Sequence, residues 1–182
     1  MKAVFLDRDG TINEEVDNLH DMAKLRILPG VAEGIRRLRA MGFLIIVVTN
    51  QPVVARGWIT EREVEEVHEE LLKRLQNENA KIDKIYYCPH HPNGNLKEYR
   101  KVCTCRKPEL ELVQMAVKEF SIDLKRSYFI GDRTTDAQTA KNAGIRSILL
   151  RTGAAGKDGR FNVKPDFVAN NFLEAVDVIE NP

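Results

Sequence analysis

The sequence predicts an α/β fold in which helices flank a mostly parallel, Rossmann-like sheet. Short apolar runs of strand length alternate along the chain with segments whose apolar residues recur at helical spacing. The first run, 3–6, ends at Asp7, and the second, 43–48, ends at Thr49. Because open α/β sheets bind ligands beyond the carboxyl ends of their strands, polar residues at these ends are the first candidates for a site.

The other elements follow in the same alternation. A helix is expected between Pro29 and Gly42, and a second begins at Thr60, which forms a capping box with Glu63. The charged run that follows, with His68 inside it, is expected on a solvated helix face. The later expected elements are, in order, a strand at 84–87, a helix after Pro108, a strand at 128–130, a small-residue helix ending at Gly144, a strand at 148–150, a loop over 151–166, a short strand near Phe167 and a helix from Asn171.

Composition limits the class of protein. The 182 residues include 28 Lys and Arg against 27 Asp and Glu, so a broad positive field for nucleic acid or an anionic membrane is not expected. The apolar start before Asp7 is too short for a signal-peptide core, and the longest apolar run has only the length of a strand. We therefore expect one domain over 1–182, a cytoplasmic location, and a monomer without nucleic-acid or membrane partners.

Polar residues gather where strands end. Asp7 and Asp9 lie two residues apart after the first strand, and Gly10 allows a sharp turn. If the second and fourth strands flank the first, further polar residues converge on the same crevice. These residues are Thr49, Asn50, Arg106, Lys107, Asp132 and Asp136.

This set has a consistent chemistry. Asp7 and Asp132 offer hard oxygen ligands for Mg²⁺, as that ion prefers. Lys107 and Thr49 offer a cation and a hydroxyl for phosphate oxygens, and the Asp9 carboxyl group is free for proton transfer. The residues alone therefore predict a phosphate-handling magnesium site.

A second cluster contains every cysteine of the chain. Cys88 and His90 are separated by twelve residues from Cys103 and Cys105. Residues i and i+2 of an extended backbone point to one side, so each half forms a two-pronged claw, whereas His91 points to the other side. Three thiolates and one imidazole suit a closed, structural Zn²⁺ site. Such a site would also fix the path of the chain into Arg106 and Lys107.

The four strand-end motifs resemble those of phosphatases in the haloacid dehalogenase superfamily. The motifs are Asp7-x-Asp9-Gly10-Thr11, Thr49, Lys107 and Gly131-Asp132-x-x-x-Asp136, in the family's order. The resemblance implies that Asp7 attacks phosphorus, that Asp9 protonates the leaving group and then activates water, and that Thr49 and Lys107 stabilise the phosphoryl group. It also implies that Mg²⁺ binds Asp7, Asp132 and the main-chain carbonyl of Asp9. Asp136 is expected behind these ligands, orienting bound water or Lys107. The spacing leaves no room for a large cap domain.

The zinc loop narrows the resemblance to the heptose bisphosphate phosphatase branch of that superfamily. The similar segments are 7–13, 49–51, 55–57, 86–92 and 103–108. The resemblance implies removal of the C7 phosphate from D-glycero-D-manno-heptose 1,7-bisphosphate, in the synthesis of nucleotide-activated heptose for lipopolysaccharide. The expected contacts with this small phosphorylated sugar are Arg8, Glu15, Val16, Asp17, Asn18, Asn50, Gln51, Pro52, Arg56, Arg106 and Arg133. Arg56, Arg106 and Arg133 are suited to grip the second, anomeric phosphate.

Other functions stay open from the sequence. A histidinol-phosphate phosphatase, or an enzyme for another small phosphomonoester, shares the chemistry, although the zinc loop of histidinol phosphatases is shorter. Two departures from the family's usual sequence bear on the identity of the sugar. Pro52 lacks a backbone N–H, and the Gly-Tyr-Val turn usual in the family is missing from residues 14–19. A phospho-accepting signalling domain or a zinc-stabilised binding module would use some of the same residues without turnover.

Overall fold

The computed structural model describes residues 1–16, 19 and 21–181. Six parallel strands form one sheet in the order β3-β2-β1-β4-β5-β6. The elements in chain order are β1 (Lys2–Leu6), the short 3₁₀ turn η1 (Met22–Lys24), α1 (Val31–Ala40), β2 (Phe43–Asn50), α2 (Glu61–Asn77), β3 (Lys84–Cys88), α3 (Glu111–Phe120), a second 3₁₀ turn η2 (Leu124–Arg126), β4 (Tyr128–Gly131), α4 (Thr134–Ala143), β5 (Arg146–Leu150), β6 (Phe167–Ala169) and α5 (Phe172–Glu180). The predicted α/β class with a parallel, helix-flanked sheet is confirmed.

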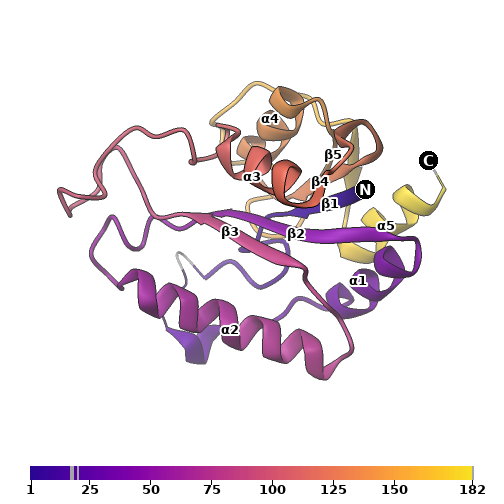
Figure 1. The fold of residues 1–182 in the computed structure, drawn as a ribbon, viewed down its shortest axis with the longest axis horizontal. Coiled ribbons are helices and arrows are strands. Elements are labelled where there is room, and N and C mark those ends of the chain that lie inside the picture. The colour runs from indigo at the N-terminus through magenta and orange to yellow at the C-terminus, as the bar shows by residue number, and fades with distance from the viewer. Residues whose placement is uncertain (17–18, 20, 182) are drawn as a thin grey trace.

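Helices cover both faces of the sheet. Figure 1 shows α1, α2 and α5 on one side and α3 and α4 on the other. Alternate residues of a strand point to opposite faces, and β1 follows this rule. Val4 and Leu6 pack into the core cluster shared with α1, α2 and α5, whereas Ala3 and Phe5 pack into the cluster shared with α3 and α4. A strand buried on both faces explains why β1 is continuously apolar until Asp7.

Strand β1 lies between β2 and β4, as the site hypothesis required. Leu6 is paired with Val47 on one side and with Ile130 on the other. The backbone N–H of Asp7 then donates to the Ile130 carbonyl at 3.0 Å, which extends this pairing by one residue. The carboxyl ends of the three central strands therefore meet at one edge.

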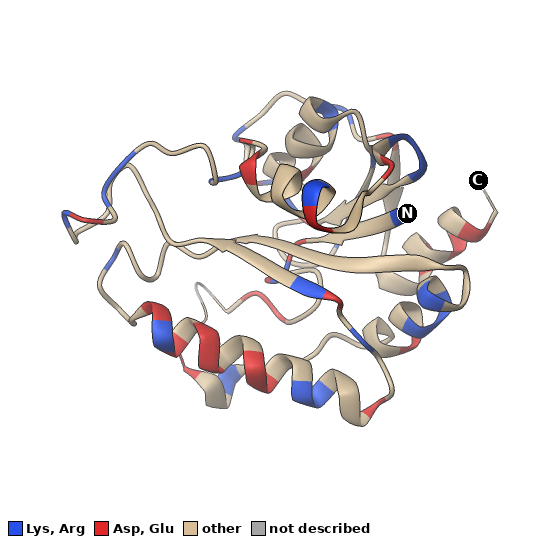
Figure 2. Cartoon of the chain, viewed as in Figure 1, with Lys and Arg blue, Asp and Glu red and all other residues tan. Residues whose placement is uncertain are grey.

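The helix termini follow the signals in the sequence. Thr60 and Glu63 form the expected capping box at the start of α2. Gly144 ends α4 in the left-handed conformation, with φ 68°, and the side chain of Asn171 caps α5. Acidic and basic residues are interleaved along α2, whereas the central strands are almost free of charge (Figure 2).

The exposed face of α2 does not include His68, contrary to the prediction. Its side chain is only 6% exposed, and it belongs to the buried residues of the helix together with Val67 and Leu71. The ring stacks edge-on against Tyr87 of β3, with centroids 5.4 Å apart. No helix among the described residues combines the length and the apolar character needed to span a bilayer.

Candidate active site

Three carboxylates meet at the carboxyl ends of β1 and β4. Asp7 follows β1, Asp132 follows β4, and Asp136 lies in the first turn of α4. One oxygen of each lies within 4.8 Å of the others. Burial, and then the charges of Asp7 and Asp136, raises the pKa of Asp132 to about 8.

The surroundings of Asp132 fit a bound cation. Its Oδ1 atom is buried and has no hydrogen-bond partner in the structure, whereas Oδ2 accepts from the Ala154 N–H at 2.6 Å. The backbone of two glycines lies close to this carboxylate. A Cβ atom added to Gly10 would lie 2.4 Å from Oδ2, and one added to Gly153 would lie 2.2 Å from it. An orphaned carboxylate oxygen among carboxylates is what a hard divalent cation would satisfy.

Lys107 supplies the positive charge of this site. Its Nζ atom lies 2.9 Å from Asp7 Oδ1 and 2.6 Å from Asp136 Oδ1, and the residue is only 4% exposed. Burial alone would lower the pKa of Lys107, but Asp136 and Asp7 outweigh it and the pKa is raised. Asn50 holds the backbone of Lys107, because its side chain accepts from the Lys107 N–H at 2.9 Å and donates to the Lys107 carbonyl at 3.2 Å.

Asp9 is held by a separate frame of buried polar groups. The Arg8 guanidinium donates to both carboxylate oxygens, at 2.9 and 2.8 Å, and Asn13 and Gln51 each donate at 2.9 Å. The Gln51 amide also donates to Thr49 Oγ1 at 3.0 Å, which ties Asp9 to the end of β2. Burial would raise the pKa of Asp9, but the Arg8 charge and these donors lower it, so the group is ionised.

Arg8 itself is buried behind Asp9. Its side chain is 1% exposed, and NH1 lies 3.1 Å from His68 Nε2, while NH2 donates to Gln51 Oε1 at 3.0 Å. Burial and the Arg8 charge lower the pKa of His68 to about 3, so the imidazole is neutral and can accept from Arg8. The structure thus places Arg8 against protein groups, outside the residues that line the cavity.

A cavity of about 230 Å³ opens in front of these groups. The predicted site residues that line it are Asp7, Asp9, Glu15, Thr49, Asn50, Gln51, Pro52, Arg56, Arg106, Lys107, Arg133 and Asp136. His91, Thr135 and Arg160 line it as well and were not predicted as site residues. Of the other predicted contacts, Val16 packs against the core, and Asp17 and Asn18 fall outside the described residues.

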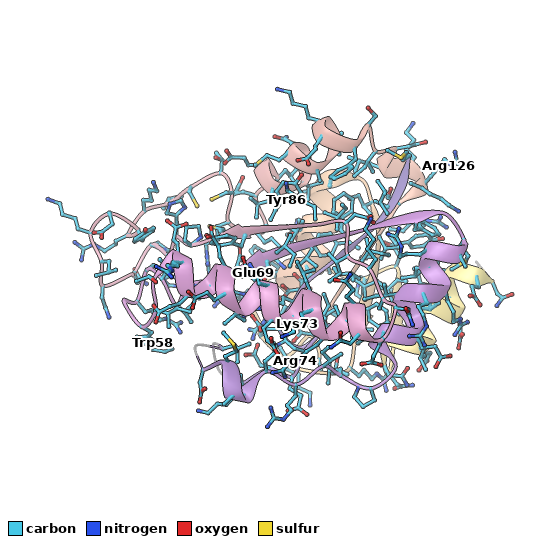
Figure 3. The ribbon with its side chains drawn as sticks, turned by 60° about the horizontal axis from the view of Figure 1, so that its bottom comes forward. Trp58, Glu69, Lys73, Arg74, Tyr86 and Arg126 are labelled. Atoms are coloured by element: carbon cyan, nitrogen blue, oxygen red, sulfur yellow. The ribbon has the colours of Figure 1, made fainter. Side chains whose placement is uncertain are left out.

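The cations of the cavity differ in their surroundings. Arg133, at the start of α4, forms an ion pair with Glu15 at 2.5 Å, which joins the 14–16 segment to this helix. Arg56 lies over the Trp58 ring, 4.9 Å from its centroid, and Trp58 projects from the turn before α2 (Figure 3). Arg106 NH1 donates to the His90 carbonyl at 3.0 Å.

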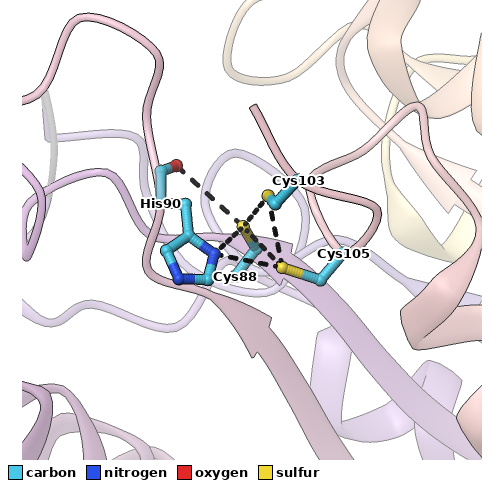
Figure 4. Close-up of side chains that lie close together, drawn as sticks. All are labelled: Cys88, His90, Cys103 and Cys105. Atoms are coloured by element: carbon cyan, nitrogen blue, oxygen red, sulfur yellow. Dashed lines mark hydrogen bonds between the residues drawn. The ribbon is translucent and has the colours of Figure 1, made fainter. Parts of the chain in front are cut away.

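The cysteine cluster directly precedes Arg106 and Lys107, two residues that line the cavity. Figure 4 shows its four side chains close together. Cys105 Sγ lies 3.2 Å from Cys88 Sγ and 3.4 Å from Cys103 Sγ, and His90 Nδ1 lies 3.3 Å from Cys105 Sγ. Metal–sulfur bonds of about 2.3 Å place the sulfurs of a regular tetrahedral site about 3.8 Å apart, close to these separations. Burial raises the pKa of Cys88 and of Cys105. Four such atoms can hold one soft metal ion, and His91 is not one of them.

Comparisons with known proteins agree with this geometry. Residues 104–175 match a family described as HAD-hydrolase-like. The D-glycero-β-D-manno-heptose-1,7-bisphosphate 7-phosphatase of Escherichia coli (strain K12) is 42% identical over 152 residues, covering 83% of this chain and 80% of that protein. Its namesake from Haemophilus ducreyi is 37% identical over 177 residues, covering 96% of each. The crystal structure of D,D-heptose 1,7-bisphosphate phosphatase from B. bronchiseptica, complexed with magnesium and phosphate, superposes with a TM-score of 0.87 at 26% identity, covering 100% of this chain and 99% of that one. This chain therefore belongs to the D-glycero-β-D-manno-heptose-1,7-bisphosphate 7-phosphatase family of haloacid dehalogenase-like hydrolases.

Proposed function

We propose that this chain is a magnesium-dependent phosphomonoesterase that removes the C7 phosphate of D-glycero-D-manno-heptose 1,7-bisphosphate through a phosphoaspartyl intermediate. The observation that carries the proposal is the convergence on one cavity of Asp7 and Thr49 from the ends of β1 and β2, Lys107 from the loop before α3, and Asp136 from the first turn of α4. Asp132 lies in the same carboxylate cluster as Asp7 and Asp136. The family relationship supports the reaction class and the sugar bisphosphate substrate.

Asp7 is the nucleophile of the proposed reaction. A carboxylate oxygen of Asp7 bonds to phosphorus as the bond between phosphorus and the C7 oxygen breaks. The incoming phosphate adds negative charge beside Asp9 and favours its protonated form, so Asp9 gives its proton to the leaving oxygen. Asp9 then takes a proton from a water molecule whose oxygen attacks phosphorus, which releases inorganic phosphate and restores Asp7.

The other residues orient and neutralise charge. Thr49 Oγ1 and Lys107 Nζ lie at the cavity and are suited to bind the equatorial oxygens of the transferred group. Asp7, Asp132 and the Asp9 carbonyl would hold Mg²⁺, with Asp136 beside Lys107. When bound, Mg²⁺ neutralises the charge of the phosphate and so reduces its repulsion from the Asp7 carboxylate.

We also infer that Cys88, His90, Cys103 and Cys105 bind one structural Zn²⁺. The four ligand atoms lie within 4.8 Å of one another, and a full set of four protein ligands leaves no open position for chemistry. The site joins the end of β3 to the segment directly before Arg106 and Lys107. Zinc would thus fix the backbone that carries two residues of the cavity.

Two arginines of the cavity favour a second phosphate on the substrate. Arg56 and Arg106 line it without a carboxylate partner among the described residues. Histidinol phosphate carries a positive ammonium group in addition to its phosphate, which these arginines would repel, so we favour the bisphosphate. We further propose that the chain acts as a cytoplasmic monomer of one domain.

A substrate panel tests the function. Phosphate release is measured with heptose 1,7-bisphosphate, a hexose bisphosphate and histidinol phosphate, each with added Mg²⁺ and with EDTA. We expect the highest kcat/KM for the heptose bisphosphate, loss of one phosphate only, and no turnover in EDTA. A higher kcat/KM for histidinol phosphate would reject the substrate, and turnover by Asp7→Asn at the wild-type rate would reject the mechanism.

A further inference from the structure

Arg160 belongs to a group of basic residues that line the cavity. Arg56, His91, Arg106 and Arg160 all line it, and they come from three segments far apart in the sequence. Arg106 and Arg160 also line a second, adjoining hollow of about 230 Å³. No salt bridge of the described chain involves Arg56, Arg106 or Arg160. Arg133 differs, because Glu15 neutralises it.

The three guanidinium groups of this cluster are positively charged, and none of them has an ion-pair partner among the described residues. Positive groups that face each other without a counter-ion are stabilised by an anion placed between them.

The backbone around Arg160 is fixed although its side chain is exposed. Asp158 accepts from the Thr134 N–H at 2.7 Å and from Thr134 Oγ1 at 2.9 Å, at the N-terminus of α4. On the other side of Arg160, the Phe161 N–H donates to Thr134 Oγ1 at 3.2 Å. The Gly156 N–H donates to the Asp132 carbonyl at 2.7 Å. Arg160 therefore lies between two anchored residues, on a loop fastened to the catalytic end of β4.

We propose that Arg160 is a specificity residue that binds the phosphate that is not transferred. This inference rests on the proposed function, since it needs a substrate with two phosphates. A guanidinium can donate two parallel hydrogen bonds to one phosphate, and Arg106 can approach the same group from the zinc loop. With Arg160 on the β5–β6 loop and Arg106 before α3, the anion is held from two sides of the cavity.

Kinetics with paired substrates test the assignment. The substrates are heptose 1,7-bisphosphate and the heptose 7-monophosphate, which lacks only the second phosphate. The variants are Arg160→Ala and Arg160→Lys, with Lys157→Ala as the matched control, because Lys157 is an exposed cation of the same loop that does not line the cavity. We expect Arg160→Ala to lower kcat/KM for the bisphosphate about tenfold, or about 1.4 kcal/mol, mostly through KM. The monophosphate should change less than about twofold, Arg160→Lys should recover part of the loss, and Lys157→Ala should match the wild type.

The outcomes separate the two proposals. If the wild type prefers the bisphosphate and Arg160→Ala keeps that preference, the Arg160 assignment is wrong and the proposed function stands. Equal losses on both substrates in Arg160→Ala would also overturn it, because they would place Arg160 at the transferred phosphate or in the fold. A wild type that hydrolyses the monophosphate as well as the bisphosphate would overturn the proposed substrate itself.

Discussion

Replacing Lys107 by Met removes the only cation in contact with two buried carboxylates among the described residues. Lys107 Nζ lies 2.6 Å from Asp136 and 2.9 Å from Asp7, and Asp132 lies in the same cluster. Methionine has a similar length and no charge. The variant therefore leaves three neighbouring carboxylates without the positive charge of Lys107. We expect it to lose stability as well as activity.

The size of the loss follows from these distances. At an effective dielectric constant of about 20, each contact is worth about 6 kcal/mol before desolvation is subtracted. Removing one partner of a buried ion pair costs about 3–5 kcal/mol in measured cases, because the remaining charge is left without compensation. A protein of this length shifts its melting temperature by about 2–4 °C per kcal/mol, so we expect a decrease of roughly 6–20 °C.

Thermal and urea unfolding in EDTA at pH 8 measure this loss. Lys84→Met is the matched control, since Lys84 forms an exposed pair with Glu119 at 3.5 Å. Such exposed pairs contribute about 0–1 kcal/mol, so the control should unfold close to the wild type. The double variant Lys107→Met with Asp136→Asn should regain part of the loss, because it removes one of the unpaired carboxylates.

Two results would refute this reasoning. A Lys107→Met protein as stable as the wild type in EDTA at pH 8 would show that the carboxylates do not need the lysine. A double variant less stable than Lys107→Met would show that Asp136 contributes through contacts other than the charge of Lys107.

Three further predictions concern the metals and the frame around Asp9. Protein purified without added zinc should contain about one zinc per chain, and Cys103→Ala should lose it while the exposed neighbour variant Val102→Ala keeps it; metal analysis of both decides. His68→Leu leaves an Arg8 N–H donor buried without a partner and should cost about 1–3 kcal/mol in urea unfolding, and an unchanged midpoint would contradict that contact. In EDTA, the contribution of Asp132 to stability should be complete below about pH 4 and be lost as the pH rises through about 8, because folded Asp132, with a pKa of about 8, keeps a proton that the unfolded chain loses near 3.8. Mg²⁺ should therefore raise the melting temperature more at pH 8 than at pH 5, and equal shifts would argue against ligation by Asp132.

The catalytic edge could be predicted because its signals are local. Apolar runs that stop at Asp7, Thr49 and Asp132 mark strand ends, and parallel strands bring their carboxyl ends to one edge. The cysteine cluster was predictable for the same reason, since the two i, i+2 pairs need only a short extended backbone to form two claws. The structure brings all four atoms together.

The frame behind Asp9 could not be predicted, because it depends on packing between distant elements. A charged Arg8 between Asp7 and Asp9, the two proposed catalytic residues, suggests a substrate contact. Burial of this side chain becomes acceptable only when Gln51 from the end of β2 and His68 from α2 both reach it. The same contact explains why His68 is buried in a helix whose sequence favours a solvated face.

Arg160 was missed for a different reason. The 151–166 segment is rich in glycine and polar residues, which predicts a loop without indicating where the loop lies. Its position depends on Asp158, which caps the N-terminus of α4, and no pattern in the sequence links these two segments. The position of such a loop can be known only from the contacts that hold it in the structure.

Covalent trapping at Asp7 tests the central claim most directly. Asp9→Asn removes the base that activates water, so the phosphoenzyme should accumulate when this variant reacts with an aryl phosphate, whose leaving group needs no acid. Acid quench, proteolysis and mass spectrometry then locate the phosphoryl group. We predict one phosphoryl group per chain on Asp7, and none when Asp7→Asn is added to the variant. A phosphoryl group on another residue, or turnover without any covalent species in the Asp9→Asn protein, would contradict the account.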